Sequence, residues 1–310
     1  MKGWRIPHVQ IHICVLLWGF TAILGKLITL AALPLVFWRV LIVSMSLLLW
    51  FPLWRQIAQV SRRDWLLSLG AGVLVTVHWL CFYGSIKLAN ASVAATCIAL
   101  APVFLSIAEP LLSRQPFNAR ELMLAGISIP GVVLVVGGIP TNMLGGFALG
   151  ALAALLVAFF SILNKRLAMR VPALGLTAIE MGAGTILLGL LMPAWPLLGT
   201  EFSWPGQSDL LWLLVLAVAC TLFPFALAVV ALRQMSAFSA QLAVNLEPVY
   251  AIALAAVFLG EGEELRWPFY AGVCMILGAV LVHARLHSSP RSNNAAGLQD
   301  KKNPVPKHRV

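Results

Sequence analysis

Long apolar runs alternate along this chain with short stretches that hold charged residues, proline or glycine. An α-helix needs about 20 predominantly apolar residues to cross the hydrocarbon core of a bilayer. Runs of about that length occupy residues 9–29, 33–53, 66–87, 91–113, 121–139, 146–166, 173–194, 210–232, 237–259 and 267–286. The pattern predicts an all-α membrane protein with ten transmembrane helices.

The composition strengthens this prediction. Of the 310 residues, 61% are hydrophobic and 10% are charged, and the mean hydropathy is +0.93, whereas soluble domains use roughly 45 to 50% apolar residues. Ten spans account for about 200 residues and leave about 110 for loops and tails. A water-soluble globule is therefore excluded, and no room remains for a soluble domain.

The chain is basic, with 21 Lys and Arg residues against 11 Asp and Glu. If the N-terminus is cytoplasmic, most of the basic residues lie in predicted cytoplasmic segments. The outer loop 195–209 has no Lys or Arg, and its charged residues are Glu201 and Asp209. Lys and Arg concentrate on the cytoplasmic side of membrane proteins. The asymmetry predicts that both termini are cytoplasmic, and it explains the basic charge without nucleic acid as a partner.

Both ends of the chain are predicted to lie outside the bilayer. Residues 1–8 form a short cytoplasmic tail, because the apolar stretch after them continues past Gly25 without a signal-peptide cleavage site. Residues 287–310 are rich in Ser, Asn, Pro, Lys and Arg and lack apolar periodicity. They are predicted to form a disordered, basic cytoplasmic tail.

The five cysteines lie within apolar runs, at Cys14, Cys81, Cys97, Cys220 and Cys274. An odd number without a spacing motif supports neither a disulfide framework nor a metal site. We interpret them as packing residues and expect no cofactor and no metal.

The second half of the chain repeats the first. A shift of 146 residues places Leu100, Pro102, Val103 and Phe104 on Leu246, Pro248, Val249 and Tyr250. A shift of 139 residues places Ile23, Leu24 and Lys26 on Ile162, Leu163 and Lys165. The predicted repeats therefore cover residues 9–139 and 146–286, with five helices each.

An odd number of helices makes the second repeat enter the membrane from the opposite side. Inverted repeats of this kind are typical of secondary transporters, in which a midplane site between the halves opens alternately to each side. The repeat therefore predicts a pseudo-twofold axis in the membrane plane.

Three short motifs accompany the two five-helix units: Trp18-Gly19-Phe20, the Leu-Glu-Pro-Val-Tyr run at 246–250, and Leu259-Gly260-Glu261. Together they resemble the EamA-type branch of the drug/metabolite transporter superfamily over about residues 9–286. The first half departs from the pattern, because Arg114-Gln115 stands where a Leu-Gly-Glu ending would be and Glu109-Pro110 occurs earlier.

The resemblance implies an exporter of small organic metabolites, such as amino acids or related compounds, that works by alternating access in a bacterial inner membrane. The implied partners are a small-molecule substrate, the lipid bilayer and, as a candidate coupling ion, the proton. The sequence does not give the oligomeric state.

Charged residues at membrane depth are costly and are functional candidates by default. Four are expected to be buried: Arg39, Glu109, Glu180 and Glu247. At 1.5 Å per residue from the outer helix ends, Arg39 and Glu247 differ in membrane depth by about 6 Å. We therefore hypothesise that they form a buried charge pair. Glu180 is a candidate protonatable group, because burial disfavours the charged form of a carboxyl.

Pro102 and Pro248 occupy equivalent positions in the fourth and ninth helices. A proline inside a helix removes a backbone hydrogen bond and kinks the helix. Paired interruptions in corresponding helices point to a transporter binding site, although both prolines could also be packing kinks.

Aromatic side chains with a few polar tips suit a small, partly apolar organic solute. The predicted substrate-binding residues are Trp18, His78, Trp79, Tyr83, Asn164, Gln241 and Asn245. Core packing remains an alternative for each aromatic residue, and a hydrogen-bonded structural histidine is an alternative to a proton-carrying His78.

Two other functional classes remain open. A channel-like facilitator would fit ten helices, but the chain has no filter motif and its mid-membrane prolines suit moving helices. An integral-membrane enzyme would need a nucleophile, base or metal cluster, and no close grouping of His, Asp or Cys occurs. No nucleotide-binding P-loop is present either, so we expect a secondary transporter and no enzymatic activity.

Overall fold

The computed structural model describes residues 5–113, 119–232, 243–244, 246–261 and 265–287. These residues form helices and short connections and contain no strand. The prediction of an all-α protein is confirmed for this part of the chain.

The helices follow one another with short connections. The first part of the chain contains α1 (Arg5–Leu27), α2 (Ala32–Leu48), α3 (Phe51–Ala58), α4 (Arg62–Leu88), α5 (Ala91–Ile98), α6 (Ala101–Ser113) and α7 (Ala119–Gly138). The second part contains η1 (Thr141–Met143), α8 (Leu144–Ala168), α9 (Ala173–Leu191), η2 (Met192–Leu198), α10 (Gln207–Leu214), η3 (Val215–Leu222), α11 (Phe223–Leu232), α13 (Glu247–Leu259) and α14 (Trp267–His287).

Within the described residues, six helices are long and apolar enough to cross a membrane. A seventh is added if α2 and α3, which are bent by 95° relative to each other, form one span. Shorter apolar helices occur in α7, α13 and α14. The structure is thus compatible with ten spans, although these length and hydropathy criteria identify fewer.

The second apolar run does not form one straight helix from residue 33 to residue 53. It ends at Leu48, and the chain turns through Trp50, whose backbone is extended, into α3 with Pro52 in its first turn. Proline is well tolerated in the first turn of a helix but not farther inside one. The predicted boundary at residue 53 is therefore wrong. The α1 helix begins at Arg5, within the predicted N-terminal tail 1–8, whose cytoplasmic location stays a prediction.

Two other runs are irregular in the middle. The run 91–113 is divided between α5 and α6 by a turn at residues 99–100. The run 210–232 changes from α-helix to π-helix over η3 and back to α-helix in α11. Single π-helical turns inside α-helices occur frequently at functional sites.

One end of the bundle, which we call the Asp209 end, is closed by buried polar contacts. Asp209 accepts hydrogen bonds from the Thr29 amide (2.8 Å) and hydroxyl (2.6 Å). Glu261 accepts hydrogen bonds from the amides of Ala91 (3.0 Å) and Ser92 (2.8 Å) at the start of α5. Both carboxylates are buried, with 4% and 2% of the residue exposed.

The opposite end, which we call the Asp64 end, is joined by two ion pairs whose acidic side chains, those of Glu109 and Asp64, are 35% and 16% exposed. Lys165 Nζ lies 3.4 Å from Glu109 Oε1, and Arg170 Nη1 lies 3.5 Å from Asp64 Oδ1. The lysine and arginine side chains are 64% and 57% exposed.

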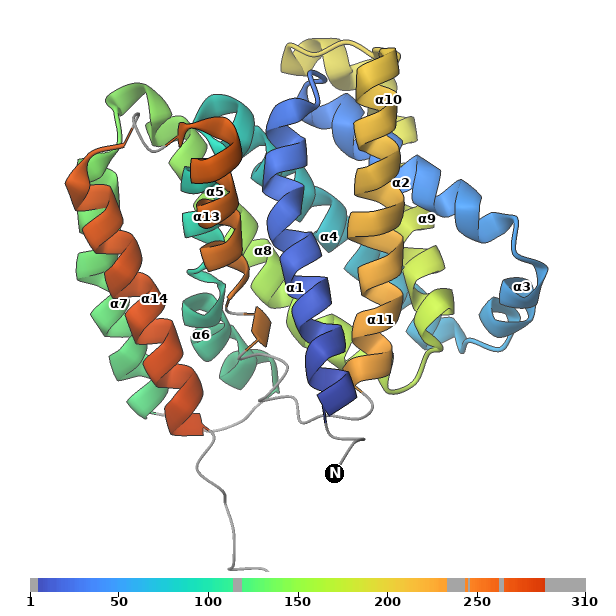
Figure 1. Cartoon of the computed structure of the whole chain (residues 1–310). Coiled ribbons are helices and arrows are strands. Elements are labelled where there is room, and N and C mark those ends of the chain that lie inside the picture. The colour runs from blue at the N-terminus through green and yellow to red at the C-terminus, as the bar shows by residue number, and fades with distance from the viewer. Residues whose placement is uncertain (1–4, 114–118, 233–242, 245, 262–264, 288–310) are drawn as a thin grey trace, which may run out of the picture.

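The helices pass back and forth between these two ends, as Figure 1 shows. The α1 helix leads to Thr29 at the Asp209 end, whereas α8 leads to Lys165 at the Asp64 end. The α4 helix packs along α8, α7 along α14, and α1 along α13. Where α1 packs on α13, a side chain on Gly19 would come within 3.1 Å of Tyr250 Cβ. The glycine therefore allows α1 and α13 to approach closely.

Candidate functional site

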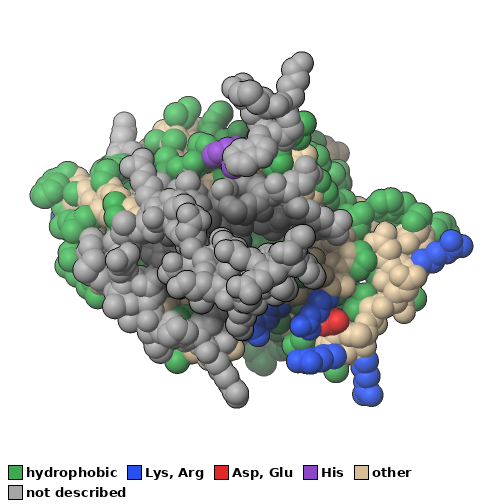
Figure 2. All heavy atoms as spheres, turned by 90° about the horizontal axis from the view of Figure 1, so that it is seen from below, with side chains coloured by type: hydrophobic (Ala, Val, Ile, Leu, Met, Phe, Trp, Pro, Cys, Tyr) green, Lys and Arg blue, Asp and Glu red, His purple; other side chains and the backbone are tan. Residues whose placement is uncertain are grey.

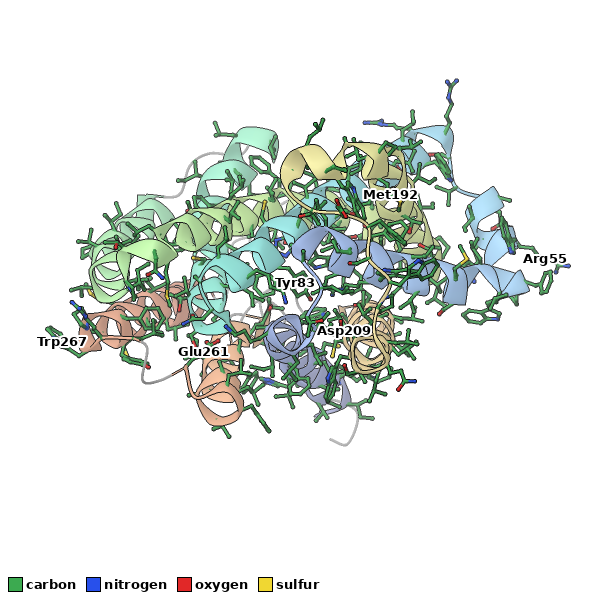
Figure 3. All side chains as sticks on the ribbon, turned by 90° about the horizontal axis from the view of Figure 1, so that it is seen from above. Arg55, Tyr83, Met192, Asp209, Glu261 and Trp267 are labelled. Atoms are coloured by element: carbon green, nitrogen blue, oxygen red, sulfur yellow. The ribbon has the colours of Figure 1, made fainter. Side chains whose placement is uncertain are left out.

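A buried arginine lies where three helices meet. Arg39 of α2 is 2% exposed. Its Nε donates a hydrogen bond to Thr221 Oγ1 of η3 (2.9 Å), and its Nη1 donates one to the Tyr83 hydroxyl of α4 (2.8 Å). Viewed along the bundle in Figure 3, Tyr83 lies in the middle of the molecule, whereas Arg55 and Trp267 lie at opposite edges.

Aromatic rings surround the guanidinium. Its Cζ lies 3.8 Å from the ring centroid of Trp79 and 5.7 Å from that of Tyr83. A cation over the face of an indole ring is attracted by the ring quadrupole. Trp79 and Tyr83 are four residues apart on α4, so they share one helix face and reach the same arginine.

The positions of Tyr83 and Thr221 follow from local structure. A side chain on Gly25 of α1 would come within 2.6 Å of the Tyr83 ring, so the ring needs a glycine opposite it. Thr221 donates its own hydroxyl hydrogen to the carbonyl of Leu216, five residues earlier in the π-helix (2.7 Å). The Thr221 oxygen is therefore oriented to accept a hydrogen bond from Arg39.

A row of aromatic rings extends from Trp79 across the bundle. The centroid of the Phe225 ring on α11 lies 6.2 Å from the Trp79 ring and 6.2 Å from the Trp18 ring on α1. Trp18 Nε1 is buried and has no hydrogen-bond partner. The row Trp79–Phe225–Trp18 thus connects Arg39 to a second donor nitrogen.

His78 is next to Trp79 in sequence but contacts another helix. Its Nδ1 lies 2.8 Å from the carbonyl oxygen of Ala153 on α8, and its ring stacks on Phe82. Because a carbonyl can only accept, Nδ1 carries the hydrogen in this contact. This geometry fits the alternative of a structural histidine.

Of the remaining predicted substrate-binding residues, Asn164 is not in this cluster. Asn164 lies eleven residues beyond Ala153 on α8, which is about 16 Å along the helix, and its buried Oδ1 has no partner. Gln241 and Asn245 lie outside the described residues. Of the seven, the structure brings Trp18, Trp79 and Tyr83 into one cluster with Arg39.

The four charged residues expected at depth differ in their surroundings. Glu180 on α9 is 1% exposed, and its Oε1 has no hydrogen-bond partner. Glu109 is not buried, because near the end of α6 its side chain is 35% exposed and reaches Lys165. Glu247 is partly buried in the first turn of α13.

The hypothesis of a direct pair between Arg39 and Glu247 is wrong for this structure. The two residues interact electrostatically, but they are not among the salt bridges of the described residues. The guanidinium is instead bonded to Tyr83 and Thr221.

The two repeated prolines begin half-helices. Pro102 lies in the first turn of α6, directly after the turn at residues 99–100, and Pro248 lies in the first turn of α13. At these positions the missing proline amide is not needed for an intrahelical bond.

Two residues of the cluster were not predicted from the sequence. Thr221 is one of many small polar residues in apolar runs, and only the π-helical register directs it at Arg39. Phe225 is one of many apolar residues in the run 210–232. No pattern along the chain distinguishes either of them.

Comparison with known proteins places the chain in a family. The sequence model of the EamA-like transporter family matches residues 6–137 and 144–284. An uncharacterized transporter from Archaeoglobus fulgidus is 26% identical over 291 residues, which are 90% of this chain and 98% of that protein. A solved crystal structure superposes with a TM-score of 0.61 at 18% identity over 91% of this chain and 99% of the other, so it shows the fold alone. The chain therefore belongs to the EamA-like transporter family, a family of membrane transporters.

Proposed function

We propose that this protein is a secondary transporter that moves small organic metabolites by alternating access between two inverted five-helix repeats, residues 9–139 and 146–286. The observation that carries the proposal is the Arg39 cluster, in which the guanidinium of the first repeat is bonded to Thr221 of the second. A polar, aromatic cluster at the contact of two inverted halves is the arrangement expected of a transporter substrate site.

The backbone supports the repeat. Leu100 and Leu246 each donate a hydrogen bond to the carbonyl three residues earlier (2.9 and 3.0 Å), and each accepts one from the amide four residues later (3.2 and 3.0 Å). These four bonds correspond to each other at the shift of 146 residues found in the sequence. The local structure around both prolines is thus alike.

Helix packing supports an inverted relation. Each helix of one repeat can be replaced by its counterpart in the other. The α4–α8 contact then corresponds to the contact of α1 with η3 and α11. The α1–α13 contact corresponds to that of α8 with α5 and α6. Both members of each pair occur. The contacts α2–α9, α5–α13 and α7–α14 map onto themselves, as contacts across a twofold axis do.

We place the Asp64 end in the cytoplasm and the Asp209 end outside, in a bacterial inner membrane. Figure 2 shows basic side chains on the face viewed from below, where the described helices run down to the Asp64 end. At this end, the exposed basic residues in the connections and adjoining helix ends are Arg55, Arg62, Arg63, Lys165, Arg166 and Arg170. This agrees with the preference of Lys and Arg for the cytoplasmic side. The direction of export rests on the family resemblance.

Counterflow in proteoliposomes tests the function. Vesicles containing the purified protein are loaded with one unlabelled solute, and uptake of a trace of the same radiolabelled solute is followed for a panel of amino acids, organic acids, amines and sugars, with and without a pH gradient. We expect transient accumulation of at least one solute above its equilibrium level. Equilibration without accumulation would favour the channel-like facilitator, and no movement of any solute would contradict both.

Thiol labelling tests the orientation separately. A cysteine introduced in the loop between η2 and α10 is expected to react with a membrane-impermeant maleimide added to whole cells. A cysteine introduced near Gln59 is the matched control and is expected to be protected. The reverse result would invert the topology.

A further inference from the structure

We infer that Arg39 binds a carboxylate group of the transported molecule, so that the substrate is a small organic monoacid with an apolar or aromatic body. This inference rests on the proposed function and assigns a substrate class to the Arg39 cluster.

Within the described part of the chain, no acidic side chain forms an ion pair with Arg39. Its hydrogen-bond partners are two neutral hydroxyl groups, those of Tyr83 and Thr221. Glu247 acts on it only as a longer-range charge, since the two form no salt bridge. A charge removed from water is costly unless an opposite charge contacts it. A negatively charged ligand would supply that contact.

The guanidinium also has unused donors. It carries five N–H groups, and the hydrogen bonds that it makes within the described part of the chain use Nε and Nη1 only. Nη2, with its two N–H groups, has no partner there. A carboxylate binds two neighbouring N–H groups of a guanidinium in a bidentate manner. The residue is therefore prepared for a planar anion.

The second unpaired polar atom of the cluster has the same polarity. Trp18 Nε1 is a buried donor without a partner, and it lies across the Phe225 ring from Trp79. Both unpaired groups are thus donors, which complement an acceptor-rich ligand. The aromatic row between them offers an apolar surface for the body of the same molecule.

The charge balance favours one negative charge over two. The cluster holds one guanidinium, and Glu247 contributes a carboxyl within electrostatic range. A phosphate dianion would be repelled by that carboxyl more strongly than a monoanion, and no second basic side chain contacts Arg39 within the described residues. A carboxylate therefore fits better than a phosphate.

Matched pairs of compounds test the inference in the wild-type protein. Each pair consists of a carboxylate and its primary amide, which have nearly the same shape but differ in charge: 3-phenylpropionate, hexanoate and phenylalanine with their amides. Binding to the purified full chain in nanodiscs is measured by equilibrium dialysis. We expect at least one carboxylate to bind about tenfold or more tightly than its amide. If no carboxylate binds more tightly than its amide, the inference is overturned.

Two variants assign the effect to Arg39. In Arg39→Gln the preference for the carboxylate should disappear while binding of the amide remains, and that remaining binding shows that the site is folded. Arg39→Lys keeps the charge but not the planar fork, so it should retain part of the preference. Arg170→Gln removes an exposed positive charge at the Asp64 end and should leave the preference unchanged. An equal preference in Arg39→Gln and wild type would overturn the assignment.

Failure of this inference can be distinguished from failure of the proposed function. If amines or sugars show counterflow and no carboxylate is preferred over its amide, the proposed transport function stands and the inferred substrate class is contradicted. An Arg39-dependent carboxylate preference with no movement of any solute would keep the binding site and contradict transport.

Discussion

At the Asp209 end, buried carboxylates accept hydrogen bonds from groups far away in the sequence, whereas at the Asp64 end the exposed Lys165 and Arg170 form ion pairs with partly buried carboxylates at 3.4 and 3.5 Å. Exposed ion pairs contribute about 0 to 1 kcal/mol. Hydrogen bonds to a charged group contribute about 1.5 to 3 kcal/mol each. Among the described residues, the polar contacts at the Asp209 end are therefore stronger than those at the Asp64 end.

This difference bears on the proposed alternating access, in which the two ends open in turn. Opening the Asp209 end requires that Glu261 leave the amides of Ala91 and Ser92, and that Asp209 leave Thr29. Opening the Asp64 end separates ion pairs whose basic side chains are already exposed. We therefore expect the structure to represent a state that opens more readily at the Asp64 end.

The largest effect is expected for Glu261→Gln. A glutamine has one acceptor oxygen, so its NH₂ group must face a backbone N–H that cannot become an acceptor. One buried hydrogen bond is lost and two donors oppose each other, which should cost about 3 kcal/mol. The measurements are thermal unfolding in detergent and maleimide labelling of Ser92→Cys in a Cys274→Ser background.

The labelling reaction should be faster in Glu261→Gln, since Ser92 is 3% exposed when the contact is intact. Glu201→Gln is the control, because this acidic residue near the same end is exposed. Unchanged stability and labelling in Glu261→Gln would mean that Glu261 does not close this end.

A smaller effect is expected for Asp209→Asn at the same end. Asparagine keeps the acceptor for the Thr29 amide, and the Thr29 hydroxyl can turn to accept from the new NH₂ group, because a hydroxyl both donates and accepts. The loss should be about 1 kcal/mol, mainly from replacing charged by neutral hydrogen bonds. Thermal unfolding compares it with Asp209→Ala, which removes both acceptors. A loss in Asp209→Asn as large as that in Glu261→Gln would contradict this account.

Much of the fold could be predicted from hydrophobic run length alone. In the described residues all ten apolar runs are helical in whole or in part, because a chain in lipid must satisfy its backbone groups within each segment. Where the chain bends could not be predicted equally well. The breaks before α3 and α6 have proline signals in Pro52 and Pro102, but the 95° angle of the first and the π-helix of η3 depend on packing.

The site could be predicted only in part, for reasons of rotation and depth. Arg39, Trp79 and Tyr83 were recognisable as polar or aromatic residues far from helix ends. Helix rotation decides their partners, so the sequence suggested Glu247 where the structure has Thr221. Asn164 was predicted to bind substrate, but it lies near the C-terminal end of α8, close to the Asp64 end.

Glu180 sharpens the comparison, because it is a buried carboxyl without the partners that Glu261 and Asp209 have. Its backbone packs on Gly72 of α4, and no charged group of the described residues acts on it. Replacement of an unpartnered buried acid by a neutral isostere loses no native hydrogen bond. Glu180→Gln should therefore change the free energy of unfolding by less than about 1 kcal/mol, in contrast to Glu261→Gln.

If Glu180 carries the coupling proton, the same variant should also lose the response of solute counterflow to a pH gradient while it retains exchange without a gradient. Glu109→Gln, an exposed carboxyl in an ion pair, is the matched control and should keep the response. If Glu180→Gln keeps the response to the pH gradient, Glu180 does not carry the coupling proton.

The smallest effect is expected where Lys165 meets Glu109. Both side chains are partly exposed, so water screens the pair and competes for both groups. A double-mutant cycle with Lys165→Gln and Glu109→Gln should give a coupling energy below about 0.5 kcal/mol in thermal or denaturant unfolding. The pair Arg170 and Asp64 is less suitable for this test, because Asp64 also bonds to Ser61 at the start of α4. A coupling energy near 3 kcal/mol would show that the Asp64 end is held as firmly as the Asp209 end, and the asymmetry on which the direction of opening rests would no longer hold.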